Sequence, residues 1–161
     1  MGTPLPVEPS AYAATLRPVG ATFVTLRIEG ALRGYVGSLA AVRPIVADVA
    51  HHAYRAAFHD PRFPNLAAHE RDVLRIHIAL LSPPQPMTCD SEMGLLAQLR
   101  PGIDGLVLEQ GPNRGTFLPS VWTQISQADK FLAQLKLKAG MDATDWPRDV
   151  RVSRHTVQEI E

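Results

Sequence analysis

The sequence has 161 residues, and its 16 Lys plus Arg balance 16 Asp plus Glu, so the formal net charge is zero. A neutral chain has no overall field to attract a nucleic acid or an anionic membrane. With 45% hydrophobic and 20% charged residues, it does not have the composition of a disordered polyelectrolyte. The length suits one domain, with room for two lobes.

We expect neither a membrane-spanning helix nor a signal peptide. No run of eighteen apolar residues predicts a membrane-spanning helix, and the Pro-rich start does not resemble a signal peptide. The single Cys89 matches no zinc-ligand spacing and cannot form an internal disulfide. We therefore expect a cytoplasmic protein.

In the first half of the chain the pattern predicts a Pro-rich extended arm, a β-hairpin turning at Glu29 and Gly30, a helix, and a third strand with alternating apolar residues. These elements cover residues 1–19, 21–28 with 32–37, 44–59, and 73–81. Histidines 51 and 59 share one helix face with Arg55, which we interpret as a solvated face.

A Pro-rich linker at 82–86 is followed by a short helix at 92–99. The second half then predicts another hairpin, a helical stretch, a longer helix carrying the three lysines outward, and a last strand with a bulge near Arg154. These elements cover residues 104–110 with 114–118, 120–124, 127–139, and 150–158.

The order strand–strand–helix–strand thus occurs twice, and both hairpins have Glu before the turn and Arg-Gly after it. This predicts an α+β fold of duplicated ββαβ units, with largely antiparallel sheets and flanking helices. We expect residues 20–161 to form one domain, with lobe-like halves at about 20–82 and 102–159 and a cleft between them.

Three segments carry the candidate ligand-binding residues. Arg33 lies beside the bare backbone of Gly34 and Gly37, where it could hold an anion, or where the glycines simply mark a hairpin bulge. Arg114, Gly115 and Thr116 form a similar element, with a surface Arg and a capping Thr as the plainer interpretation.

In the third segment, 59–64, two prolines fix the backbone that carries Asp60 and Arg62, as a rigid site loop or as a structural ion pair. No metal site is expected, because a cation interrupts the histidine row and no His-Glu-x-x-His spacing occurs. No motif predicts a cofactor.

Taken together, these segments resemble the AMMECR domain family, also called the AmmeMemoRadiSam system protein A family. The matching motifs occur in family order at residues 20–26, 32–37, 57–63, 81–84, 102–106, 114–122 and 137–140. The resemblance implies a duplicated β/α fold with a cleft, and an association with a radical SAM protein and a Memo-like protein. It does not imply an established activity.

The chain departs from the family pattern in two motifs and at its start. Tyr35 stands where the family has Cys, and His59 where it usually has Glu. A Tyr can donate a hydrogen bond but cannot replace a thiolate nucleophile. The family's N-terminal helical segment is shortened here to the Pro-rich arm.

Three functions follow as hypotheses. The first is an accessory or binding module that holds a small anionic ligand or a partner loop in an Arg- and Gly-lined cleft; its residues are Arg33, Gly34, Tyr35, Gly37, Arg62, Arg114, Gly115 and Thr116. The second is a hydrolase or transferase for a phosphate- or carboxylate-bearing substrate, with Tyr35, His59, Asp60 and Glu109 as catalytic candidates. The third, a nucleic-acid-binding regulator, is disfavoured by the zero net charge.

Overall fold

The computed structural model describes residues 3–161 and divides the chain into two compact units. Unit 1 comprises the chain up to Ser82 together with Gln158–Glu161, and unit 2 comprises Pro83–Val157. Each unit contains an antiparallel β-sheet with at least one α-helix, which confirms the predicted α+β class.

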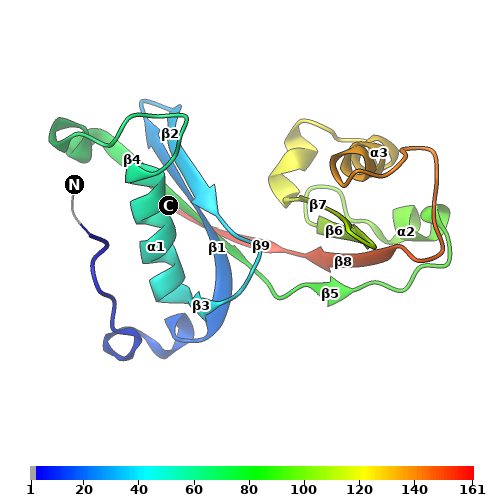
Figure 1. Cartoon of the computed structure of the whole chain (residues 1–161), viewed down its shortest axis with the longest axis horizontal. Helices are drawn as coiled ribbons and strands as arrows, with labels where there is room; N and C mark the ends of the chain where they lie inside the picture. Colours follow the sequence, from blue (N-terminus) through cyan, green and yellow to red (C-terminus); the bar gives the residue numbers. More distant parts are fainter. Residues whose placement is uncertain (1–2) are drawn as a thin grey trace. The chain divides into compact units, whose positions relative to one another are not determined.

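Unit 1 is built on one sheet and one long helix (Figure 1). Its strands and helices are β1 Val19–Ile28, β2 Ala31–Gly37, β3 Arg43–Pro44, α1 Ile45–Phe58, the 3-10 helix η3 Ala68–Val73, β4 Leu74–Leu81 and β9 Val157–Ile160. The strand order is β2-β1-β4-β9, and β3 also pairs with the start of β1. The helix α1 covers one face of β1 and β2 and buries Val24, Leu26, Ala56 and Ala57 (Figure 1).

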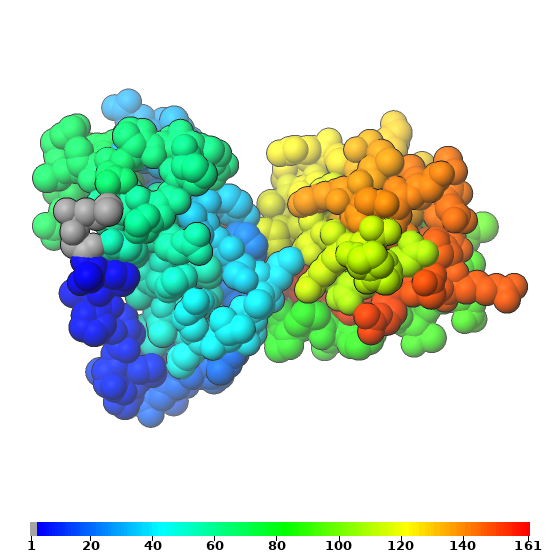
Figure 2. Space-filling model, in the orientation of Figure 1, coloured from blue at the N-terminus to red at the C-terminus, as the bar shows by residue number. Residues whose placement is uncertain are grey.

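The predicted arm is more compact than expected. Its residues 1–2 lie outside the described range, and the rest forms two 3-10 turns, η1 Pro9–Ala11 and η2 Ala14–Leu16. Arg17 closes this segment by donating to the carbonyls of Ser10 and Tyr12. The segment (dark blue in Figure 2) lies against unit 1 and leads into β1.

Unit 2 repeats the architecture with a larger core. Its elements are β5 Gln85–Pro86, α2 Glu92–Gln98, β6 Gly105–Gln110, β7 Asn113–Phe117, the 3-10 helix η4 Pro119–Thr123, α3 Ala128–Lys138 and β8 Arg151–His155. The strand order is β5-β8-β6-β7. The core includes Leu106 and Leu108 from β6, Phe131 from α3, and Trp122, whose ring stacks on Phe131 at 3.8 Å.

The duplication is visible in the sheet topology. In both units the first strand of the hairpin pairs with the second and also with the strand that follows the helix, giving β2-β1-β4 and β7-β6-β8. Both hairpins have two-residue loops, Glu29-Gly30 and Gly111-Pro112. Positive φ angles at Glu29, Gly30 and Gly111 give these loops the primed turn geometry that matches the twist of paired strands.

Three sequence expectations were wrong. The predicted last strand is two strands, because the chain leaves the unit 2 sheet after His155 and joins β4 of unit 1 as β9. The predicted linker contains β5, which pairs with β8. Lys136 does not point outward: it is fully buried, donating to Glu92 and to the carbonyl of Asp145, so its charge is paired inside the unit.

Candidate functional site

The candidate residues divide between the two units. Unit 1 holds Arg33, Gly34, Tyr35, Gly37, His59, Asp60 and Arg62, and unit 2 holds Glu109, Arg114, Gly115 and Thr116. Each group is therefore built from the local structure of its own unit.

Arg33 is an extra residue in the β1–β2 ladder. Leu26 pairs with Gly34 and Arg27 with Leu32, so Arg33 has no partner across the ladder and forms a bulge. Its side chain is only 12% exposed and makes a two-bond contact with Glu70, at 2.7 and 2.8 Å. It also donates to the carbonyls of Pro64 and Asn65. The bulge thus aims Arg33 at the 64–70 loop, which it holds in place.

The side chains of Asp60 and Arg62 form hydrogen bonds with the backbone of Tyr35. The N–H of Tyr35 donates to Asp60 Oδ2 at 2.9 Å, and Arg62 Nη2 donates to the Tyr35 carbonyl at 3.2 Å. Arg62 also donates to Asp60 through its backbone N–H, Nε and Nη2. Because β2 is an edge strand, these hydrogen bonds satisfy the N–H and carbonyl of Tyr35, which could otherwise pair with another strand.

The electrostatics agree with a structural ion pair. The guanidinium of Arg62, followed by the N–H groups of Tyr35 and Arg62, holds the pKa of the buried Asp60 carboxyl well below its usual range. Arg33, followed by the N–H of Ala67, lowers the pKa of Glu70 to about 2. Both carboxylates are ionised at neutral pH, and their lowered pKa values make them weak proton acceptors, which does not favour either as a general base.

The glycines of β2 permit close packing. A Cβ on Gly34 would overlap the carbonyl oxygen of Ala56 in α1, and a Cβ on Gly37 would overlap the ring of Phe23. Gly34 is therefore the point where α1 meets the sheet.

The side chain of Tyr35 lies on the sheet face turned away from α1. Its ring stacks on Phe23 at 5.5 Å, and its cross-strand neighbour is Thr25, which in turn pairs with His77. His77 Nε2 lies 2.6 Å from Glu159 Oε2. Burial, followed by the charge of Glu159, raises the pKa of the Tyr35 phenol, so at neutral pH it is a hydrogen-bond donor.

His59 ends α1 and is exposed, with its ring 5.3 Å from that of Tyr54. Among the described residues of unit 1, no hydrogen bond joins the Tyr35 hydroxyl or the His59 ring to another catalytic candidate of that unit. The three candidates of unit 1 therefore do not form a nucleophile–base pair with one another.

In unit 2, Gly115 has the same role as Gly34. A Cβ there would lie 2.8 Å from the Cα, Cβ and N of Ala139, at the end of α3. The neighbouring Thr116 accepts a hydrogen bond from Lys138 at its carbonyl, 2.9 Å away. Packing against α3 thus fixes the backbone at Gly115 and Thr116, and the side chain that remains a binding candidate in this segment is that of Arg114.

Arg114 belongs to a cross-strand row of charges. Glu109 of β6 pairs with Arg114 of β7 on one side and with Arg151 of β8 on the other. Arg114 Nε lies 3.8 Å from Glu109 Oε1, and Arg151 Nη2 lies 3.2 Å from Glu109 Oε2. We call these three residues the Arg-Glu-Arg row. The arginine side chains are 60% and 79% exposed, so the row carries one net positive charge at the surface.

Sequence reasoning missed Glu70 and Arg151, which contact the candidates Arg33 and Glu109, and Glu159, which lies beside His77. Arg151 could have been found from its place in the last strand, had that strand been paired with 104–110. Glu159 could not, because nothing in the pattern of 150–158 shows that the chain changes sheet after His155.

Metal and thiol chemistry gain no support within residues 3–161. No group of three or more His, Cys, Asp or Glu side chains there is arranged to hold a metal ion. Burial, followed by the charge of Asp90, raises the pKa of the Cys89 thiol, which keeps it protonated at neutral pH. No helix among these residues is long and apolar enough to cross a bilayer.

Fold and motifs together define a duplicated α+β protein, and the comparisons with known proteins agree. The AMMECR1 family model matches residues 3–160, so the chain belongs to the AMMECR1 family. The crystal structure of an uncharacterized protein from Pyrococcus horikoshii matches 95% of this chain and 79% of its own, with a TM-score of 0.80 and 29% sequence identity.

Among curated relatives, a protein of Methanothermobacter thermautotrophicus is 38% identical over 120 residues, which are 74% of this chain and 62% of that protein. A Thermotoga maritima protein is 36% identical over 138 residues, which are 84% of this chain and 74% of that protein. The chain thus spans less than two thirds of the length of the first relative and about three quarters of the length of the second.

Proposed function

We propose that this chain is a binding or accessory module of the AMMECR1 family that holds a small anionic ligand at the Arg-Glu-Arg row. The observation that carries the proposal is the difference in availability among the three candidate arginines. The donors of Arg33 and Arg62 serve Glu70, Asp60 and backbone carbonyls. Arg114 is 60% exposed and makes only a 3.8 Å ion pair to Glu109 among the described residues.

The chemistry of the row suits an oxyanion. A guanidinium presents a fork of N–H donors that matches the two oxygens of a carboxylate or phosphate. Two such groups flank one carboxylate, on strands β7 and β8 that lie two spacings of about 4.8 Å apart with β6 between them, and their long side chains both reach toward Glu109.

Calorimetric titration with inorganic phosphate and with acetate tests this function. We expect weak binding, with Arg114→Gln lowering the affinity several-fold. Arg148→Gln is the matched control, because it removes the same charge from an exposed position of unit 2 outside the row. An equal loss of affinity in both variants would show that the ions sense net charge and not this site.

The accessory role rests on the resemblance of the motifs to the AmmeMemoRadiSam system protein A family, which implies an association with a radical SAM protein and a Memo-like protein. Titration of this chain against each purified partner from the same genome would test it. Failure of both to bind, with the ion binding intact, would leave a ligand-binding module that works alone.

One observation favours a second function, a hydrolase or transferase. His77 Nε2 lies 2.6 Å from Glu159 Oε2, in the same cross-strand row as Tyr35, and a histidine beside a carboxylate is a candidate general base. A screen of phosphate and carboxylate esters would need to reveal turnover that His77→Gln and Tyr35→Phe abolish. Turnover that survives both substitutions would remove the catalytic alternative.

A further inference from the structure

The face of the unit 1 sheet that is turned away from α1, which we call the distal face, carries three different side chains along β1. These are Phe23, Thr25 and Arg27, because the alternating residues Val24 and Leu26 are buried under α1. Phe23 and Thr25 are partly exposed and Arg27 is exposed. The strand therefore presents an aromatic ring, a hydroxyl group and a cation in that order, about 7 Å apart.

The neighbouring strands add similar side chains on the same face. Tyr35 of β2 lies opposite Thr25, and its ring stacks on that of Phe23 at 5.5 Å with an interplanar angle of 22°. His77 of β4 lies opposite Thr25 on the other side. Because directly opposed residues of paired strands point to the same face, these side chains belong to the distal face.

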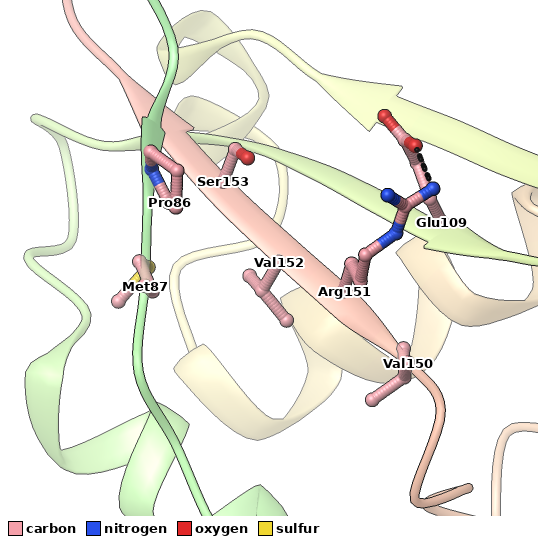
Figure 3. Close-up of a pocket in the computed structure, with 7 residues that line it drawn as sticks. All are labelled: Pro86, Met87, Glu109, Val150, Arg151, Val152 and Ser153. Atoms are coloured by element: carbon pink, nitrogen blue, oxygen red, sulfur yellow. Dashed lines mark hydrogen bonds and ion pairs between the residues drawn. The ribbon is translucent and has the colours of Figure 1, made fainter.

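Arg27 and Arg75 are direct cross-strand partners on this face. Both are exposed, and among residues 3–161 neither forms an ion pair with a carboxylate, although Arg27 donates to the carbonyl of Gly30 at 3.0 Å. Like charges directly opposite each other destabilise a sheet. In the Arg-Glu-Arg row a protein carboxylate separates the two arginines, as the Glu109–Arg151 pair in Figure 3 shows. On the distal face, an anion from solution can take that place.

We propose that the distal face binds a nucleoside monophosphate, with the base on the Phe23–Tyr35 pair and the phosphate at Arg27 and Arg75. This site lies in unit 1 and goes beyond the proposed function, which concerns the Arg-Glu-Arg row of unit 2.

The aromatic pair accounts for the base. Planar bases stack on aromatic side chains that a sheet displays on an uncovered face, and this is a recurring mode of nucleotide recognition. A Cβ on Gly37 would overlap the ring of Phe23, so the bare backbone of that glycine lets the ring lie close to the sheet. The phenol of Tyr35 supplies a hydrogen-bond donor beside the stack.

The spacing of the rows accounts for the sugar and the phosphate. The row that contains Thr25 lies two residues from the Arg27–Arg75 pair, about 7 Å along the strands, and a ribose separates base and phosphate by a comparable distance. The Thr25 hydroxyl and the His77 ring can form hydrogen bonds with the sugar hydroxyl groups. Two guanidinium groups offer a phosphate monoester several parallel N–H donors. A single nucleotide also agrees with the zero net charge, which disfavours a long polyanion.

The test is calorimetric titration of the full chain with AMP, GMP, CMP and UMP, with adenosine and ribose 5-phosphate as the two halves of AMP. We expect at least one nucleotide to bind, and AMP to bind about tenfold more tightly than either half, because stacking and phosphate contacts add. Arg75→Gln should lower the affinity for AMP about tenfold and leave that for adenosine unchanged. Tyr35→Leu should lower the affinities for AMP and adenosine about tenfold and leave that for ribose 5-phosphate unchanged.

The matched control is Arg71→Gln, which removes the same charge from an exposed residue of unit 1 outside the distal face and should leave AMP binding unchanged. Arg75→Gln also has a sign that damage to the fold would not give. Because the substitution removes the repulsion with Arg27, the urea midpoint of the free protein should rise while the affinity for AMP falls.

Four outcomes would overturn the distal face as a nucleotide site. One is equal binding of AMP and one of its halves, and another is an equal loss of AMP affinity in Arg75→Gln and Arg71→Gln. A third is a loss in Arg114→Gln without one in Arg75→Gln, which would place the nucleotide at the Arg-Glu-Arg row. The fourth is no binding of any of the four nucleotides, whatever the titration with inorganic phosphate shows for that row.

An oligoadenylate series separates the small ligand from a nucleic acid. We expect an oligomer to bind no more tightly per nucleotide than AMP. Affinity that rises steeply with every added nucleotide would overturn the mononucleotide in favour of a single-stranded nucleic acid.

Discussion

The two Arg-Gly dipeptides occupy corresponding places in the two units, yet they share only one of their roles. Gly34 and Gly115 both lie where a helix meets the second strand of a hairpin, against Ala56 and Ala139 respectively. Their arginines differ. Arg33 is 12% exposed and binds Glu70, whereas Arg114 is 60% exposed and lies at the end of a charged row.

The two arginines differ because the β1–β2 ladder contains a one-residue register shift and the β6–β7 ladder does not. Arg33 is the extra residue of a β-bulge, so its side chain leaves the ladder and reaches the 64–70 loop. Arg114 pairs directly with Glu109 in a ladder without a shift. A glycine at a contact with a helix is fixed by packing, but the direction of the residue before it depends on the local ladder. Similar motifs in duplicated units can therefore have different functions.

The largest expected effect tests the shared part of the comparison. Gly34→Ala places a methyl group on the carbonyl of Ala56, and Gly115→Ala places one 2.8 Å from the backbone of Ala139. Because backbone atoms cannot turn aside, we expect each substitution to cost about 3 kcal/mol in the free energy of unfolding, measured by urea denaturation.

The control is Gly94→Ala in α2, where the nearest atom is the Ser91 hydroxyl oxygen at 3.3 Å and the effect should be below about 1 kcal/mol. If Gly115→Ala proves as mild as Gly94→Ala while Gly34→Ala is destabilising, then Gly34 and Gly115 do not have the same packing role.

A smaller effect on stability is expected from replacing the arginines, which differ between the two units. Arg33→Gln removes a two-bond contact to Glu70 and leaves loop carbonyls without their donor, which should cost about 2 kcal/mol. Arg114→Gln removes only an exposed ion pair, so the cost should be below about 0.5 kcal/mol. Equal costs in matched urea titrations would contradict the assignment of Arg33 to structure and Arg114 to the surface.

The smallest effect is a difference in pH dependence. Arg33 lowers the pKa of Glu70 from the ordinary value of 4.5 to about 2 in the folded protein. The ionised Glu70 therefore stabilises the fold above pH 4.5, and this contribution is lost as the pH falls toward 2. Urea midpoints measured from pH 6 to pH 2 should fall less steeply for Glu70→Gln than for the unaltered chain. Parallel curves would mean that Arg33 does not hold Glu70 as described.

Much of the fold was predictable because its signals are local. Alternation in 21–28 and 73–81, the Glu29-Gly30 turn and the stop of α1 before Asp60 all appear where the pattern places them. The candidate site was predictable only in part. Glu109 and Arg114 are close in sequence on either side of a turn, so their pairing follows from the hairpin. Their third member, Arg151, lies in a strand whose neighbour no local signal identifies.

The sequence by itself determined the class of this protein, since periodicity and turn residues specify helices, hairpins and their order within a few residues of chain. It also determined the family, through motifs that are individually weak and jointly specific. The tertiary structure decided which candidate arginines are exposed, which lysine is buried and where the last strand ends. Those outcomes depend on contacts between residues such as Arg33 and Glu70 or Glu109 and Arg151, which are far apart in the chain and meet only when the sheets have formed.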